Sequence, residues 1–185
     1  MTLAVRERLM PVGEFLDWHP DGERWELIGG IPVRMMPEGD LHVTVKSNVI
    51  GALARRMRPP SACRPAANGR QVRINDRTSY RPDAHINCAP FSDPMEPLIQ
   101  CPVVVFEVAV SSLDRDLLEK RANYFENPRV EHVVIIDAQA RKVHHFVRGD
   151  RKARLLTSGD ILTLDGTVSL DIPVAEFFEW LPESA

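Results

Sequence analysis

The spacing of apolar residues predicts two long helices. Over residues 41–57, Leu41, Val45, Val49 and Leu53 recur every four positions, which places them on one face of a helix. The Pro59-Pro60 pair is expected to end this helix, because proline lacks the backbone N–H that a helix needs. A second amphipathic stretch covers residues 113–125, and shorter helices are predicted at residues 11–17 and 174–180.

Short apolar and β-branched runs predict a sheet. Residues 102–110, PVVVFEVAV, are apolar on both faces, which is typical of a central strand. Gly29-Gly30 separates runs at 24–28 and 31–36 and indicates a hairpin turn. The order of helices and strands predicts an α/β (α+β) fold in which a central mixed β-sheet is flanked by helices. Further strands are expected at 62–65, 71–74, 83–88, 131–137, 142–147, 154–157, 161–164 and 168–170.

Composition narrows the class of protein. The chain has 185 residues, of which 44% are hydrophobic and 26% charged, and it contains no repeat or flexible linker, so we expect a single domain over 1–185. No apolar run approaches the ~20 residues of a membrane span, and residues 1–10 lack the apolar centre of a signal peptide. These features predict a cytoplasmic protein without membrane contact. The odd number of cysteines, with no Cys-x-x-Cys pair, predicts reduced, packed thiols.

The net charge of −3 conceals a strong asymmetry along the chain. Residues 46–81 hold nine basic side chains and one acid, a net charge of +8, which leaves −11 on the remainder. Such a stretch favours contact with nucleic-acid phosphates. It is equally consistent with a solvated helix face followed by charged loops. The candidate nucleic-acid contacts are Arg55, Arg56, Arg58, Arg70, Arg73 and Arg81.

Two acidic residues occur in predicted strands. Glu107 lies within the apolar run 102–110, where an uncompensated carboxylate would cost several kcal/mol. It therefore needs a basic partner, a cation or an exposed strand end; a structural ion pair remains an alternative. Asp83 follows Pro82, and strand alternation would place it on one polar face with His85 and Asn87. An exposed strand surface with a turn-forming Pro-Asp is the other interpretation.

Lys120 joins these carboxylates as a candidate. On a helix over residues 113–125 it falls on the same stripe as Leu113, Leu117 and Tyr124, so it should point inward. The helix directly follows the strand of Glu107, and a short connection would bring Lys120 back towards that residue. A lysine that extends past the apolar face into water is the alternative.

Two carboxylates and an inward-pointing lysine are the side chains that metal-dependent phosphodiester hydrolysis uses. Carboxylate oxygens suit Mg²⁺, and an ammonium group can position water and offset charge on the phosphate. The sequence has no His-x-x-x-His cluster, phosphate-binding loop or dinucleotide fingerprint. His144 and His145 are expected on opposite faces of a strand, which argues against a metal site between them.

The motifs Pro82-Asp83 and Phe106-Glu107-Val108-Ala109 resemble those of the PD-(D/E)XK superfamily of restriction-endonuclease-like proteins. With 24–30, RWELIGG, and 133–137, VVIID, the chain is most similar, over about residues 24–147, to the Uma-type family of endonucleases within it. The resemblance implies a restriction-endonuclease-like core and a Mg²⁺ site. It implies that Asp83 and Glu107 bind the metal together with the backbone carbonyl of Val108, and that Glu26 is an accessory acid. The superfamily usually has a catalytic lysine two residues after the glutamate; this family has an apolar residue there, here Ala109, and the resemblance implies that Lys120 takes the place of that lysine. His42, Tyr80 and Tyr124 also match family positions.

The leading hypothesis is therefore a Mg²⁺-dependent endonuclease of DNA, in which Mn²⁺ could replace Mg²⁺. A homodimer is expected from the superfamily, because cutting two strands needs two sites. The alternative is a non-catalytic relative that serves as a nucleic-acid-binding or protein-interaction module. A purely structural protein would instead leave Asp83, Glu107 and Lys120 apart in space.

Overall fold

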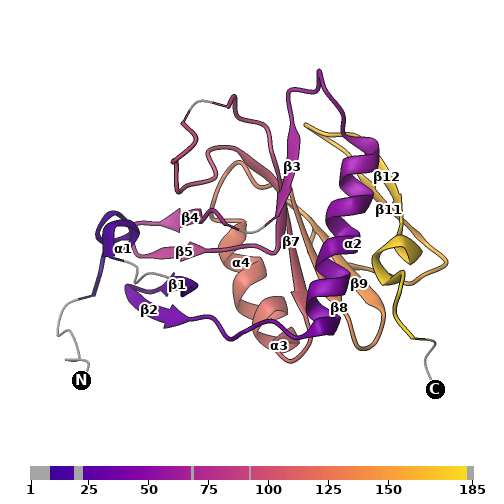
Figure 1. Ribbon diagram of the computed structural model, residues 1–185, viewed down its shortest axis with the longest axis horizontal. Coiled ribbons are helices and arrows are strands. Elements are labelled where there is room, and N and C mark those ends of the chain that lie inside the picture. The colour runs from indigo at the N-terminus through magenta and orange to yellow at the C-terminus, as the bar shows by residue number, and fades with distance from the viewer. Residues whose placement is uncertain (1–8, 19–22, 68, 92, 183–185) are drawn as a thin grey trace.

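A computed structural model describes residues 9–18, 23–67, 69–91 and 93–182 of the chain (Figure 1). Residues 1–8, which hold most of the segment used to exclude a signal peptide, lie outside this part. Within the described residues, no helix is long and apolar enough to span a bilayer.

A six-stranded mixed sheet forms the centre of the molecule. Its order is β10-β9-β8-β7-β6-β3, in which β7 and β8 are parallel and the other neighbours antiparallel. Every residue of β7 is buried, as its apolar pattern predicts for a central strand. The predicted α/β fold with a central mixed sheet is confirmed. The strands are β3 (Arg64–Ala67), β6 (Ala84–Asn87), β7 (Pro102–Ala109), β8 (His132–Asp137), β9 (Lys142–Val147) and β10 (Arg154–Leu156).

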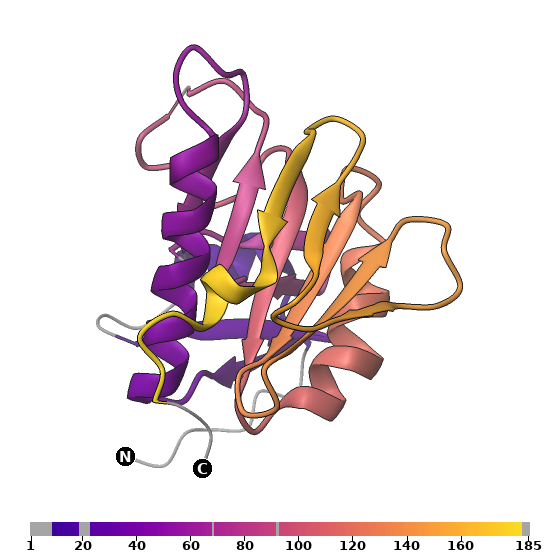
Figure 2. The ribbon, with the colours of Figure 1, turned by 90° about the vertical axis from the view of Figure 1, so that its right-hand side faces the viewer.

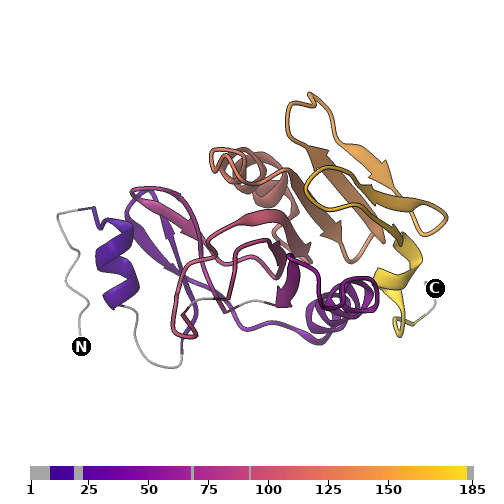
Figure 3. The same ribbon diagram turned by 90° about the horizontal axis from the view of Figure 1, so that it is seen from above.

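Helical segments pack against both faces of this sheet (Figure 3). Helix α2 (Asp40–Arg56) buries Val45, Val49 and Leu53 on the face that contains Phe106. The opposite face, which contains Val105, is covered by the helical segment between β7 and β8, to which Tyr124 belongs. The crossover needed to join two parallel strands thus places this segment directly after β7.

The predicted helix over residues 113–125 is not a regular α-helix. It consists of α3 (Leu113–Arg115), a π-helical turn η1 (Asp116–Lys120) and α4 (Arg121–Tyr124). A π-helical turn is wider than an α-helical one and often occurs at functional sites. Lys120 is the last residue of this turn and is 3% exposed, so its predicted inward direction is confirmed.

A second, four-stranded sheet lies beside the N-terminal helix α1 (Val12–Trp18) (Figure 1). Its order is β2-β1-β5-β4, and the predicted hairpin turn has left-handed φ angles of 57° at Gly29 and 86° at Gly30. A Cβ at Gly30 would lie 2.7 Å from the Cβ of Leu9, so no larger residue fits there. The strands are β1 (Trp25–Ile28), β2 (Ile31–Arg34), β4 (Val72–Asn75) and the unpredicted β5 (Thr78–Tyr80).

The C-terminal elements differ from those predicted. β11 (Ile161–Leu164) and β12 (Leu170–Pro173) form a separate two-stranded sheet, so the strand expected at 168–170 begins only at its last residue. The closing helix is a 3₁₀-helix, η2 (Val174–Phe178). Figure 2 shows these elements next to α2, where their apolar residues pack into the same core.

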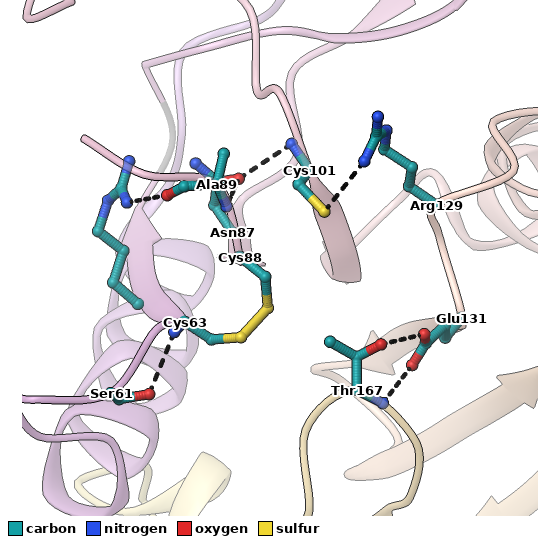
Figure 4. Close-up of a disulfide and its surroundings, with 10 residues drawn as sticks. Ser61, Cys63, Asn87, Cys88, Ala89, Cys101, Arg129, Glu131 and Thr167 are labelled. Atoms are coloured by element: carbon teal, nitrogen blue, oxygen red, sulfur yellow. Dashed lines mark hydrogen bonds between the residues drawn. A yellow bond between two sulfur atoms is a disulfide. The ribbon is translucent and has the colours of Figure 1, made fainter. Parts of the chain in front are cut away.

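The prediction of three reduced cysteines is wrong in this structure. Cys63 and Cys88 form a disulfide, while Cys101 is free and its sulfur accepts a hydrogen bond from Arg129 (Figure 4). Pairing of β3 with β6 explains the bond, since Arg64 lies opposite Asn87 and the next residues outward are the two cysteines. Their Cα atoms are 4.0 Å apart. Cysteine number and spacing carry no information on such a strand pairing.

Candidate active site

The antiparallel pairing of β6 and β7 brings Asp83 and Glu107 together. Ala84 lies opposite Phe106, so the next residues, Asp83 and Glu107, meet at one end of the strand pair. The backbone N–H of Asp83 donates to the carbonyl of Phe106 at 3.1 Å. Asp83 Oδ2 accepts a hydrogen bond from the N–H of Val108 at 2.8 Å. Both carboxylates are almost fully buried, with exposures of 5% and 4%.

Lys120 reaches the same place from the crossover helix. Its Nζ donates to Glu26 Oε1 at 2.9 Å and to Glu107 Oε1 at 3.1 Å. Glu26, on β1, also accepts a hydrogen bond from the N–H of Arg81 at 3.2 Å. Strands of two sheets and one helix thus converge on one ammonium group. The three predicted residues Asp83, Glu107 and Lys120 are brought together, with Glu26 beside them.

Two tyrosines enclose Lys120 and Glu107. The hydroxyl of Tyr124 donates to Glu107 Oε1 at 2.5 Å. The ring centroid of Tyr80 is 5.4 Å from Lys120 Nζ, and the hydroxyl of Tyr80 accepts a hydrogen bond from Asn123 at 2.6 Å. The two rings are in contact, with centroids 5.4 Å apart. Burial raises the pKa of both hydroxyls, so each tyrosine stays protonated and can donate.

The charges at this site are strongly coupled. Burial raises the pKa of Glu107 to about 8, against the lowering effect of Lys120, and the nearby Asp83, Asp116 and Glu26 raise it further. Burial would lower the pKa of Lys120, but Glu107 and Glu26 raise it well above its usual value. The raised pKa favours the protonated form of Lys120, in which its ammonium group donates hydrogen bonds. The carboxylates around it favour a further positive charge, which a divalent cation would supply.

A second group of ligand atoms meets at Asp83. One ligand atom each from Glu38, His42 and Asp83 lies within 4.8 Å of the others. His42 Nε2 is 3.1 Å from Asp83 Oδ2, and His42 Nδ1 is 3.8 Å from Glu38 Oε2. The structure therefore joins His42, predicted from the resemblance, to Asp83. Glu38 was missed by the sequence analysis; its i, i+4 spacing to His42 was the available signal.

These groups line a pocket of about 630 Å³. Glu26, Asp83, Glu107 and Lys120 form its acidic wall, and the segment that joins β2 to α2 forms another. This second wall mixes apolar side chains with charged ones; it includes Val33, Arg34, Met35, Met36, Pro37 and Glu38. The volume is within the range of pockets that bind small molecules or single groups of a polymer.

The other predicted residues lie in different surroundings. Val108 contributes its N–H to Asp83, while the role predicted for its carbonyl stays a prediction. Arg55 and Arg56 both bind Glu176 at the far end of α2, about 20 Å along the helix from His42. Arg73 pairs with Asp76, Arg70 donates to the carbonyl of Asp93, and Arg58 is exposed beyond α2. Of the six arginines, Arg81 is the one whose backbone binds a residue of the site.

The sequence model of the Uma2 family, described as "Putative restriction endonuclease", matches residues 12–175. The chain belongs to this family, and its membership supports a nuclease function. Comparison with curated proteins finds no match.

A solved structure supports the same fold. The chain is similar to the crystal structure of "a putative nuclease belonging to DUF820" from Anabaena variabilis, with a TM-score of 0.73 and 17% sequence identity. The similarity covers 94% of this chain and 99% of the other. It therefore includes both sheets and the helices around them.

Proposed function

We propose that this protein is a Mg²⁺-dependent endonuclease that hydrolyses phosphodiester bonds in DNA. One observation carries the proposal: Lys120 Nζ joins Glu107, at 3.1 Å, to Glu26 beside Asp83 in a single pocket. Membership in the Uma2 family supports the nuclease part of the proposal. The metal ion and the DNA substrate are inferred from the chemistry of the side chains.

The donor set fits a hard divalent cation. Asp83 and Glu107, with the backbone carbonyl of Val108, would hold Mg²⁺, which prefers oxygen ligands; Mn²⁺ accepts the same set. The ion would activate water and polarise the phosphate when bound.

The remaining side chains would act on position and charge. The ammonium of Lys120 would hold the attacking water and offset the charge that develops on the phosphate. Glu26 fixes Lys120 through the 2.9 Å hydrogen bond, and Tyr124 fixes Glu107 through the 2.5 Å hydrogen bond. With Lys120 protonated, the proton released by water would go to solvent or to a substrate oxygen.

The proposal extends to partners and place of action. Hydrolysis of both strands of a duplex would need two such pockets, which a homodimer would supply. The cytoplasmic location expected from the sequence belongs to the same proposal, because a cytoplasmic nuclease would have access to DNA there.

The first experiment is titration with Mg²⁺ and Mn²⁺ in a calorimeter, followed by cleavage of supercoiled plasmid. We expect the parent to bind metal and nick the plasmid, and Asp83→Asn and Glu107→Gln to lose metal binding. Lys120→Ala should lower the cleavage rate at least about 100-fold. Asp76→Asn, which changes an exposed carboxylate paired with Arg73, is the control and should match the parent. Cleavage by Asp83→Asn and Glu107→Gln at the parental rate would refute the site.

A further inference from the structure

Two cations from separate segments hold the carboxylate of Glu38. Arg24 binds Oε1 and Lys46 binds Oε2, so each oxygen has its own partner. Arg24 precedes β1, Glu38 precedes α2, and Lys46 lies within α2. The three side chains are mostly buried, with exposures of 28%, 15% and 12%. Burial would raise the pKa of Glu38, but hydrogen bonds from Lys46 and Arg24 lower it, so the carboxylate is an anion.

Two members of this ion cluster, Arg24 and Glu38, line the pocket that contains the proposed catalytic residues. Asp83 and Lys120 line the same pocket. Lys46 lies one helical turn after His42, which also lines the pocket. An anion that enters the pocket would therefore meet Arg24 and Glu38 on one wall, with Lys46 bound to the same carboxylate.

Arg81 adds positive charge next to this cluster. Its Nε is buried and has no hydrogen-bond partner within the described part of the chain. Burial lowers the pKa of Arg81, the charge of Arg24 lowers it further and the charge of Glu26 raises it, so Arg81 lies within electrostatic reach of both residues. Arg24 and Lys46 therefore hold Glu38 with Arg81 nearby, while Lys120 binds Glu26 among the carboxylates of the same pocket.

A phosphodiester has the same charge and the same number of acceptor oxygens as the Glu38 carboxylate. Both are singly charged anions with two oxygen acceptors, and arginine and lysine bind either one through charge-assisted hydrogen bonds. Exchange of one for the other leaves the negative charge that faces Arg24 and Lys46 unchanged. The displaced carboxylate would have a near partner, because His42 Nδ1 is 3.8 Å from Glu38 Oε2 and has no hydrogen-bond partner among the described residues.

We propose that Arg24 and Lys46, assisted by Arg81, form a binding site for a backbone phosphate of the nucleic-acid substrate, and that Glu38 occupies this site until the substrate displaces it. The inference rests on the proposed function for the choice of DNA as substrate. It adds a phosphate subsite outside the metal-binding carboxylates and gives Glu38 the role of an internal competitor. Removal of the competitor should strengthen binding, whereas removal of a supporting contact would weaken it.

The test measures the binding of a short fluorescein-labelled DNA duplex by fluorescence anisotropy, in the presence of EDTA. We expect Glu38→Gln to tighten the Kd about tenfold, because the uncharged amide competes poorly with phosphate. Addition of Arg24→Ala and Lys46→Ala to that variant should remove the gain. In the parental background, the same two alanines should weaken binding. Thermal unfolding of each variant establishes that it is folded.

Glu176→Gln is a matched control at the opposite end of α2. Glu176 also joins two cations, Arg55 and Arg56, and its change to glutamine removes the same charge. We expect it to leave the Kd unchanged. The inference is overturned if Glu38→Gln does not tighten binding or if Glu176→Gln tightens it equally. It is also overturned if neither the parent nor Glu38→Gln binds DNA.

The two proposals can fail separately. A parent that cuts plasmid in Mg²⁺ while Glu38→Gln has no effect on the Kd would retain the nuclease and remove the phosphate site. A parent that binds DNA more tightly after Glu38→Gln, but cuts no plasmid with either metal, would retain the phosphate site and remove the nuclease.

Discussion

At the scale of single residues, the site is organised by one buried ammonium group. Lys120 is 3% exposed and binds Glu26 and Glu107. Removal of a partner from a buried ion pair leaves an uncompensated charge that costs about 3–5 kcal/mol. Lys120 therefore holds two carboxylates in place that would otherwise repel each other. The same contact that stabilises the fold presents a fixed cation to the pocket.

A second buried titratable pair lies away from the site. His132 and His145, on β8 and β9, stack with ring centroids 5.2 Å apart, and His132 Nδ1 is 3.0 Å from His145 Nε2. Burial lowers the pKa of His145 to about 4, with further lowering by His132 and Arg154. His132 Nε2 also contacts the carbonyl of Asp165 at 2.9 Å. The pair thus joins two strands to the turn after β11.

This pair predicts a loss of stability in acid. Above pH 6.5 His145 is neutral in both folded and unfolded chains, whereas between pH 6.5 and about 4 the unfolded chain alone binds the proton. The free energy of unfolding should therefore fall as pH decreases through this window, by on the order of 2 kcal/mol from this residue. Urea unfolding of the parent and of His145→Gln at pH 7.5 and 4.5 measures it. An equal pH effect in both proteins would contradict the assignment.

Local periodicity predicted the direction of Lys120 and the strand position of Glu107, because both depend on neighbours along the chain. Partners from distant segments were not predictable in this way. His145 pairs with His132 from the preceding strand, and Glu38 binds Arg24 and Lys46. These contacts depend on the packing of elements and on side-chain rotamers, about which the spacing of residues contains no information.

At the scale of elements, the disulfide joins the connection after α2 to the end of β6. It links Cys63 to Cys88, 25 residues later, and the closed loop includes Asp83. The bond lies at one end of β6 and Asp83 at the other. Its constraint therefore acts on the strand that positions the proposed metal ligand.

We expect the disulfide to stabilise the fold by about 3 kcal/mol, as chain-entropy estimates give for a loop of this length. Cys63→Ser should lower the Tm in the absence of reductant, because the unfolded chain gains conformational freedom. Dithiothreitol should lower the Tm of the parent to that of Cys63→Ser. Cys101→Ser is the control and should retain the response to reductant. A parental Tm that does not change on reduction would contradict the prediction.

Elements with strong local signals were predicted with small errors, whereas irregular ones were not. Helix α2 was expected at 41–57 and occurs at Asp40–Arg56, because its apolar repeat and the following prolines determine both ends. The π-helical turn Asp116–Lys120 was not predicted, since apolar spacing there fits an α-helix. The three-residue strand β5 contains too few residues to display an alternation.

At the scale of the whole molecule, the basic stretch predicted at residues 46–81 does not form one positive surface. The fold distributes it over α2, both sheets and their connections, and several of its arginines have acidic partners. Arg55 and Arg56 bind Glu176, and Arg73 binds Asp76. Glu176 lies outside the stretch and neutralises part of its charge, whereas Asp76 is already counted in the net charge of +8. The sequence asymmetry therefore overstates the field of the folded protein.

The number of phosphate contacts can be measured from the salt dependence of DNA binding. Each phosphate neutralised releases counterions and contributes about −0.9 to the slope of log K against log salt concentration. If Arg24, Lys46 and Arg81 make the main contacts, the slope should be about −3. Contact with all six predicted arginines would give a slope of about −5. Anisotropy titrations from low to moderate salt in EDTA separate these values. The steeper slope would indicate that DNA contacts the whole basic stretch. The shallower slope would indicate contact at the pocket alone, because the net charge of −11 on the rest of the chain disfavours further contact with phosphates.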